Sequence, residues 1–440
     1  MNEQQTPSLT RRDFLKTSAA ATAAATATVA PLGALDISRY AHAAGNDIIK
    51  LGIIGCGGRA SGAAGQVLTT DKGVRLVAMG DILMDRVQSK RAALKKQFGD
   101  QVTVADDHCF AGFDAYKQVI AASDAVVIAN AAKFHPIHSL TALQAGKHVF
   151  VEKPHGIDPA GMKVMQAAAD LAKEKKLCLV SGLHSRYHPG YQETVKRIHD
   201  GAIGDIVSIE ENFLRAPYVV VPRNPGLNEL QWQASTQYHF TWMSGDDVIQ
   251  SLVHNLDRAS WCMKEAVPIK CHGMGGRSSM TDPIYGDVFD HHAVVYEFPN
   301  NVRLYAFCRT TTGCYDEYSS LIYGTKGCAD LMRCTIKGET NWHGNAKADA
   351  HYLEQVEYMK AIRAGTPINN GDYMVRSTMI GVMGQISCYT GKEITWEQIN
   401  KSDFYFPPKA EDCHDNMEPP TKPGPNGSYP TYVPGKTKLI

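Results

Sequence analysis

Residues 49–62 read Ile-Lys-Leu-Gly-Ile-Ile-Gly-Cys-Gly-Gly-Arg-Ala-Ser-Gly, an apolar run followed by a cluster of glycines. The run suits a short buried strand, and Gly55-x-Gly57-x-x-Ala60 matches the turn between strand and helix in dinucleotide-binding folds. The first glycine permits a tight turn, the second lets the backbone approach a pyrophosphate, and the small third residue keeps the helix close. The N-terminus of that helix offers free N–H groups to phosphate. Because many turns are rich in glycine, the pattern needs independent support.

Two further apolar runs give that support. Residues 75–81 end in Asp81, and a carboxylate roughly 20 residues after the glycines accepts hydrogen bonds from the adenosine ribose in this fold; alternatively, Asp81 caps a helix or a turn. Residues 123–130 end in Asn130, at the sheet edge where ligands of open α/β folds bind. The sequence therefore predicts a Rossmann domain over residues 47–180. Its strands are expected near 51–54, 76–79, 125–129, 148–151 and 177–182, and its clearest helices near 86–98, 139–145 and 159–175.

The composition narrows the class of protein. With 440 residues, the chain has room for two domains with sizeable cores. Its 45 Lys and Arg balance 45 Asp and Glu, and no long cationic run suggests a nucleic-acid or membrane-surface partner. The 11 cysteines include no C-x-x-C pair, which argues against structural zinc and a thioredoxin-type site. We expect no metal site and interpret one further polar cluster as a strand end or part of a substrate cleft. This cluster consists of Asp287, Asp290, His291 and His292.

The N-terminus has the layout of a twin-arginine export signal. Arg11-Arg12 precedes an Ala/Thr-rich segment, and Ala41-His42-Ala43 offers a small-x-small cleavage site. We therefore expect residues 1–43 to be a signal peptide, a periplasmic or other extracytoplasmic location, and no membrane span in the mature protein. The alternative is a chance arginine pair before a disordered arm. Because free dinucleotide is scarce outside the cytoplasm, an exported nucleotide-binding enzyme is expected to hold its cofactor tightly and recycle it in place.

The second half of the chain predicts a different sheet. Alternating apolar runs favour an open, mostly antiparallel sheet in an α+β domain over residues 181–400. Helices near 347–389 are expected to pack back on the first domain. The aromatic insertion at residues 216–245 could stack on sugars, or pack the domain or an oligomer interface. The proline-rich tail, residues 401–440, is expected to be extended, either wrapping a neighbouring subunit or disordered. The predicted strands lie near 270–273, 293–298, 303–308 and 319–323.

Several motifs carry a family resemblance. Ala145-Gly-Lys-His-Val149 runs into Glu152-Lys153-Pro154, Tyr323-Gly-Thr-Lys-Gly327 follows, and Thr390-Gly-Lys392 with Trp396 closes the region. With the glycine loop, these motifs make the chain resemble the Gfo/Idh/MocA family (glucose-fructose oxidoreductase, inositol dehydrogenase, rhizopine catabolism) from about residue 50 to residue 396. The resemblance implies an NAD(P)-dependent oxidoreductase acting on a sugar, polyol or glycoside. It places Lys153 beside the nicotinamide and a substrate hydroxyl; the alternative is a surface lysine after an edge strand. We also expect a homo-oligomer.

The remaining site predictions combine the motifs with this resemblance. Asp81 favours NAD because a carboxylate repels a 2′-phosphate, although Arg59 or Arg86 could admit NADP. His184 stands where the family more often has an amide. The expected cofactor-binding residues are Gly55, Gly57, Gly58, Arg59, Ala60, Asp81, Asn130, His135, Glu152 and Lys153. The expected substrate-binding residues are His184, Arg186, Tyr187, Gln250, His254 and Asp257.

Catalysis is expected from Lys153 and His254. Residues 246–257 read as one helix, on which Gln250, His254 and Asp257 share a face. The resemblance implies that His254 completes a triad with Lys153 and a carboxylate, but Gln250 occupies the place of that carboxylate. With an ordinary pKa near ~6.5, His254 is the best base for a sugar hydroxyl whose hydride passes to nicotinamide; the alternative is a core histidine. Either the chemistry differs, or another group orients the imidazole. The candidates are Asp246, Asp247 and Asp257.

Two other functions remain open. One is NAD-dependent glycoside hydrolysis through transient oxidation, elimination, hydration and re-reduction, which would release an aglycone without net reduction of the cofactor. The other is a non-catalytic nucleotide-binding sensor. In that case, substitution of Lys153 or His254 would leave function intact.

Overall fold

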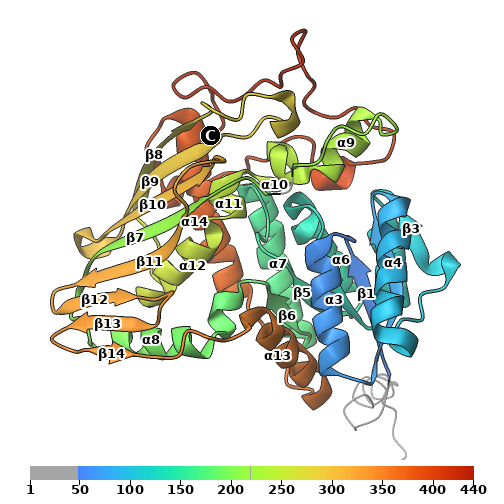
Figure 1. The fold of residues 1–440 in the computed structure, drawn as a ribbon, viewed down its shortest axis with the longest axis horizontal. Helices are drawn as coiled ribbons and strands as arrows, with labels where there is room; N and C mark the ends of the chain where they lie inside the picture. The colour runs from blue at the N-terminus through green and yellow to red at the C-terminus, as the bar shows by residue number, and fades with distance from the viewer. Residues whose placement is uncertain (1–47, 219) are drawn as a thin grey trace, which may run out of the picture. The chain divides into compact units, whose positions relative to one another are not determined.

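The computed structural model describes residues 48–218 and 220–440, and the predicted signal peptide lies outside them. The blue to green part of the chain in Figure 1 forms a parallel sheet with helices packed against it. Within the described residues, this sheet has six strands in the order β3-β2-β1-β4-β5-β6. The strands are β1 Ile49–Ile54, β2 Val74–Asp81, β3 Cys109–Ala111, β4 Ala125–Ile128, β5 His148–Val151 and β6 Leu179–Ser181. The helices are α3 Gly58–Thr70, α4 Met84–Phe98, α5 Ala115–Ala122, α6 His135–Gln144 and α7 Pro159–Lys175.

The central strands of this sheet are buried on both faces, which explains their continuous apolar sequences. Leu51, Ile53 and Val126 have no exposed surface. Strand order reverses between β1 and β4, the point at which α/β folds bind ligands. Gly55 directly follows β1 and adopts a φ of +91° in the turn. A Cβ at this position would lie 2.7 Å from the Asn130 backbone nitrogen. Glycine is therefore required both by the turn and by the close approach of the two loops.

The second sheet is mixed and mostly antiparallel, as predicted. Within the described residues it has nine strands in the order β14-β13-β12-β11-β7-β10-β9-β8-β15, with β7 and β10 parallel. The helices α12 Val253–Cys262 and α14 Gly371–Thr390 contact it, and α13 Ala350–Ala364 contacts α3 of the first sheet. The strands are β7 Ile206–Arg215, β8 Lys270–Gly276, β9 His291–Glu297, β10 Arg303–Thr310, β11 Glu317–Gly324, β12 Gly327–Asp330, β13 Thr335–Gly338, β14 Trp342–His343 and β15 Ile394–Thr395.

The expected single helix over residues 246–257 is wrong. The chain forms α11 Asp247–Gln250, then breaks, and α12 begins at Val253. Asp246 precedes α11 with φ of +70°, and its carboxylate accepts the N–H of Asp247. The N–H of Leu252 then reaches back five residues to the Asp247 carbonyl at 3.0 Å, which closes a wide turn and ends α11. Gln250 and His254 consequently lie on separate helices.

The insertion and the tail pack against each other. The insertion carries α9 Glu229–Ser235 and α10 Thr241–Ser244, whose Trp232 and Trp242 are buried. The tail follows α15 Trp396–Lys401 and is extended, as predicted, but packs on its own chain, beside α9 in Figure 1. Gln233 donates to the Thr421 carbonyl at 2.8 Å, and the Tyr429 hydroxyl donates to Glu229 at 2.5 Å. Among the described helices, none is long and apolar enough to cross a membrane.

Candidate active site

A cleft lies at the carboxyl ends of β1, β2 and β4. Four predicted cofactor residues line it together: Gly55, Gly57, Asp81 and Asn130. A Cβ on Gly57 or on Gly58 would meet no atom of the described chain within 4 Å, so the backbone at the start of α3 is open to a ligand. This open cradle at a helix N-terminus fits a pyrophosphate.

Asp81 fixes a turn and also lines the cleft. Its carboxylate accepts N–H groups from Cys56 at 2.7 Å and from Leu83 at 3.1 Å, which fixes the turn after β2. The side chain also lines the cleft, and a carboxylate has about four acceptor sites. Asp81 therefore keeps acceptor capacity for a ribose hydroxyl.

The other six predicted cofactor residues lie outside the lining of this cleft: Gly58, Arg59, Ala60, His135, Glu152 and Lys153. Ala60 is fully buried on α3 against the sheet. His135 is buried, and its ring nitrogens contact the Pro154 carbonyl at 2.6 Å and the Asn130 carbonyl at 3.1 Å. Its imidazole therefore ties the loop after β4 to the loop after β5. The Arg59 guanidinium pairs with carboxylates, described below. Direct contact of these residues with a cofactor stays a prediction.

The insertion also reaches this cleft, which no motif in the sequence indicated. Ala234, Gln237 and Met243 line it from the insertion side. The Arg86 guanidinium donates to the Ser235 carbonyl at 2.7 Å and so ties α4 to the end of α9. The aromatic composition of the insertion indicated packing or sugar stacking, but composition alone cannot show which surface a segment covers.

Lys153 lies just after β5, next to this edge of the sheet. Its ammonium donates to the carbonyl oxygen of Gln250 at 2.7 Å. The preceding carboxylate, Glu152, pairs with Arg59 at 2.5 Å, and Arg59 pairs with Glu354 of α13 at 2.9 Å. Although burial opposes ionisation, Arg59 keeps the pKa of Glu152 below its usual value, whereas burial and Glu152 raise the pKa of Glu354.

This carboxylate pair and His351 are close enough to consider a metal. Ligand atoms of Glu152, His351 and Glu354 lie within 4.8 Å of one another. The Arg59 guanidinium already supplies the positive charge between the two carboxylates. Because Arg59 balances the charge of the cluster, no metal is assigned to it, although Glu354 Oε2 has no hydrogen-bond partner among the described residues.

Three imidazoles lie beside Lys153. The ring centroid of His184 is 4.9 Å from that of His254 and 4.0 Å from that of His351. Burial, helped by Lys153 and His184, holds the pKa of His254 well below its ordinary value. The neutral imidazole that results near pH ~7 can accept a proton. The structure thus brings together Lys153, His184, Gln250 and His254.

His351 was missed by the sequence analysis. It begins an amphipathic helix that was expected only to pack back on the first domain. Because α13 packs against α3, the His351 imidazole lies at the site although it follows Lys153 by nearly 200 residues. A histidine on the side of a helix predicted to face the nucleotide domain was the available signal.

The aspartates considered as partners for His254 are engaged elsewhere. Asp257 pairs with Arg186 at 2.8 Å and accepts from Ser377, and Asp247 pairs with Arg215 at 3.0 Å. The Nδ1 atom of His254 has no hydrogen-bond partner among the described residues. The prediction that one of these aspartates, or Asp246, orients His254 is therefore wrong.

Two expected substrate residues also have other contacts. Arg186 pairs with Asp257 and with Glu265, and the rings of Trp261 and Tyr373 lie 4.9 and 4.5 Å from its guanidinium carbon. The Tyr187 hydroxyl donates to the Asn370 side chain at 2.8 Å. The structure therefore does not join Arg186, Tyr187 and Asp257 to the group around Lys153, because these side chains bind one another and nearby helices.

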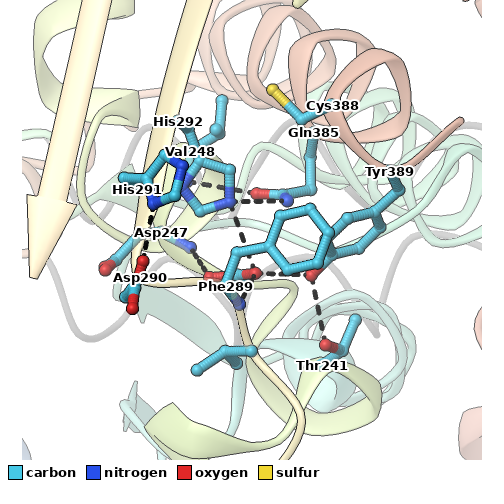
Figure 2. A network of polar contacts seen from close by, with 12 residues as sticks. Thr241, Asp247, Val248, Phe289, Asp290, His291, His292, Gln385, Cys388 and Tyr389 are labelled. Atoms are coloured by element: carbon cyan, nitrogen blue, oxygen red, sulfur yellow. Dashed lines mark hydrogen bonds and ion pairs between the residues drawn. The ribbon is translucent and has the colours of Figure 1, made fainter. Parts of the chain in front are cut away.

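Tyr389, Phe289 and His292, which are labelled in Figure 2, all contact the Asp246 carboxylate. Its Oδ2 atom accepts the Tyr389 hydroxyl at 2.6 Å and the Phe289 N–H at 2.9 Å, and His292 Nε2 lies at 3.4 Å. Asp290, which directly precedes β9, accepts the N–H groups of residues 278–280. The polar cluster seen in the sequence is therefore a strand end. Through Asp246 it fixes the start of α11 and hence the Gln250 carbonyl that binds Lys153.

Comparison with known proteins identifies the first part of the chain. Residues 49–182 match the model of the oxidoreductase family GFO_IDH_MocA, described as a NAD-binding Rossmann fold. Residues 49–182 are therefore a NAD-binding domain of the Gfo/Idh/MocA type. Residues 8–28 match the twin-arginine translocation signal sequence. The protein is therefore directed across the cytoplasmic membrane to the periplasm.

The relatives of this chain are distant in sequence. It is 27% identical over 214 residues to inositol 2-dehydrogenase of Acidothermus cellulolyticus, covering 48% of this chain and 53% of the relative. The match thus spans about half the length of that protein. Inositol 2-dehydrogenase of Salmonella typhimurium is 25% identical over 335 residues, covering 72% and 87%. The aldose-aldose oxidoreductase of Caulobacter crescentus, solved with glycerol, has the same fold, with a TM-score of 0.60, 17% identity, and coverage of 79% and 99%.

Proposed function

We propose that the mature protein is an NAD-dependent oxidoreductase of the periplasm that oxidises a hydroxyl-bearing carbon of a sugar, polyol or glycoside. One observation carries the proposal. The Lys153 ammonium, which follows β5, is fixed on the Gln250 carbonyl, and the neutral imidazole of His254 on α12 lies near it. Both lie beside the strand edge that forms the dinucleotide cleft. His135 connects the loop after β4, which lines the cleft, to the loop after β5, which carries Lys153.

The side chains supply the acid–base part of such a reaction. A bound nicotinamide would accept the hydride from the carbon. His254 takes the hydroxyl proton as a carbonyl forms, and Lys153 donates a hydrogen bond to the same oxygen. Gln250 Oε1 is buried without a partner in the described chain and can accept from a neighbouring hydroxyl. Neutral hydrogen-bonding groups of this kind suit a polyol, and the relatives named above act on inositol and aldoses according to their names.

The cofactor we propose is NAD, held tightly. Asp81 lines the cleft where a 2′-phosphate would be repelled, and Arg59 is committed to Glu152 and Glu354 instead of the cleft. Ala234, Gln237 and Met243 of the insertion line the cleft. We expect this lining to slow the exchange of a bound dinucleotide with solvent. Assembly into a homo-oligomer stays a prediction.

The test begins with purified mature protein. One portion is denatured and any released dinucleotide is identified by chromatography. The rest is mixed with polyols, sugars and glycosides while reduced-nicotinamide absorbance and aglycone release are followed together. Bound NAD or NADH and an absorbance change without aglycone support the proposal. Aglycone release without lasting absorbance change would indicate the redox-assisted glycosidase. A protein that neither contains nor binds dinucleotide would contradict both.

A further inference from the structure

Three histidines from three separate segments form a continuous row that starts at the proposed base. His254 comes from α12, His184 from the 3-10 turn His184–Tyr187, and His351 from the first turn of α13. The centroid separations of 4.9 and 4.0 Å are contact distances between rings. His254 is 7% exposed, whereas the His351 side chain is 38% exposed. The row therefore leads from a buried imidazole to an accessible one.

The inner part of the row has unused ring nitrogens. The Nδ1 atoms of both His254 and His184 are buried without a hydrogen-bond partner among the described residues. Buried polar atoms are normally hydrogen-bonded, so two adjacent unpaired nitrogens require an explanation. At the outer end, His351 Nδ1 lies 3.3 Å from Glu354 Oε1. The Nδ1 atoms of the two inner rings are thus free to take part in proton transfer.

The charges around the row keep the imidazoles neutral near pH ~7. Burial lowers the pKa of all three, to about 4 for His351. Lys153 and Arg258 act in the same direction on His254 and His184, and Arg59 and Lys153 on His351. Glu152 and Asp349 oppose this at His351. A neutral imidazole has one N–H and one free nitrogen, as proton transfer along a row requires.

We propose that His184 and His351 form a proton relay that connects His254 to solvent. The inference rests on the proposed function. Each oxidation breaks a C–H and an O–H bond: the hydride reduces NAD, and the proton enters one ring nitrogen of His254. His254 then releases a proton from its other nitrogen to His184, which passes one to His351 and on to water. The products are a carbonyl compound, NADH and one proton in solution, and each imidazole returns to its neutral form. The relay replaces a carboxylate partner, since Gln250 cannot take up a proton.

The experiment compares His184→Phe and His351→Phe with wild type and with His272→Asn, a histidine exposed on β8. Phenylalanine keeps an aromatic ring in the row but cannot carry a proton. We expect kcat of each Phe variant to fall roughly 10-fold to 100-fold, at or below the lower end of the range for direct general acid–base catalysis, because the relay acts through His254. The solvent deuterium isotope effect should rise, KM should change little, and added imidazole should restore part of kcat. His272→Asn should match wild type.

Other outcomes separate the relay from the proposed function. If wild type reduces NAD with a polyol and His351→Phe has unchanged kcat and isotope effect, the relay is wrong and the function stands. A change in KM alone would make His351 a substrate contact and also overturn the relay. If wild type shows no NAD-dependent oxidation, the proposed function fails and the relay falls with it.

A second measurement avoids turnover altogether. Histidine side chains of the cofactor-free protein are titrated by NMR with nitrogen-15 labelling. Coupled rings should make the His184 titration shift when His351 is replaced by phenylalanine, whereas His272→Asn should leave it in place. An unchanged His184 titration would contradict the row as a connected path.

Discussion

At the level of single residues, the account depends most on Lys153 and His254. We expect Lys153→Met and His254→Asn each to lower kcat by about 10² to 10⁴, because each removes a group that acts on the reacting oxygen. The dinucleotide should remain bound, since the cleft is built by other residues. Steady-state kinetics and the dinucleotide content of each variant check this. Lys173→Met, at an exposed position of α7, is the matched control. Unchanged kcat in both active-site variants would contradict the catalytic roles given to Lys153 and His254.

Asp81 decides between the two nicotinamide cofactors. We expect NAD to bind at least ~10-fold more tightly than NADP, because the carboxylate faces the position of the 2′-phosphate and Arg59 is paired elsewhere. Asp81→Ser should narrow the ratio by removing the negative charge. Fluorescence titration of cofactor-free protein measures both affinities. Equal affinities in wild type would show that Arg86, which also lines the cleft, binds the phosphate.

At the level of elements, the position of the Gln250 carbonyl depends on the break between α11 and α12, which the buried contacts of Asp246 fix. Tyr389→Phe removes the 2.6 Å hydrogen bond to Asp246 inside a buried network. We expect a loss of about 1–3 kcal/mol in the free energy of unfolding, measured by urea denaturation, and a lower kcat because the Gln250 carbonyl is displaced. Tyr405→Phe, at a residue 37% exposed, should change neither quantity. A Tyr389→Phe protein as stable as wild type would contradict the role given to this network.

Local patterns predicted the elements around the first sheet well. The strand 49–54, the glycine turn and the carboxyl-edge positions of Asp81 and Asn130 follow from short-range sequence and the rules of parallel sheets. The three-residue β3 was missed, since it is too short for a periodic signal. The break after Gln250 was missed because it depends on buried contacts of Asp246 with β9 and α14, which lie far along the chain.

The candidate site was predicted only in part for the same reason. Lys153, His184, Gln250 and His254 were expected near one another and lie together. Arg186 and Asp257 carried the right chemistry, yet they neutralise each other in the fold. Pairing between distant charges cannot be read from spacing, because each charge has several candidate partners until the helices are packed. His351 joined the site through tertiary packing alone.

At the level of the whole molecule, buried histidines set the response to acid. Burial lowers the pKa of His135, His138, His155, His184, His254 and His351. The unfolded chain binds these protons near pH ~6.5 and the native chain does not, so stability is complete above that pH and falls as pH decreases through it. Each fully buried histidine costs about 2 kcal/mol between pH ~7 and ~5.

Buried carboxyls whose pKa is raised act in the opposite direction but are fewer. Burial raises the pKa of Glu211 to about 8 and that of Asp287 to about 6, and it also raises the pKa of Asp158 and Glu354, so these groups favour the native state as pH falls. The histidines outnumber them, and we therefore expect a lower urea midpoint at pH ~5 than at pH ~7. Urea unfolding at the two pH values tests the balance. A midpoint that is equal or higher at the lower pH would mean that the histidines are not buried in neutral form.

The proposed function requires transfer of a hydride from a carbinol carbon of the substrate to nicotinamide. The most direct measurement supplies a polyol deuterated at its carbinol carbons to the loaded enzyme and analyses the dinucleotide by mass spectrometry. The account predicts reduced NAD carrying one deuterium, formed by wild type and lost in Lys153→Met and His254→Asn. Substrate turnover that leaves the dinucleotide without deuterium, or equal labelling by both variants, would contradict it.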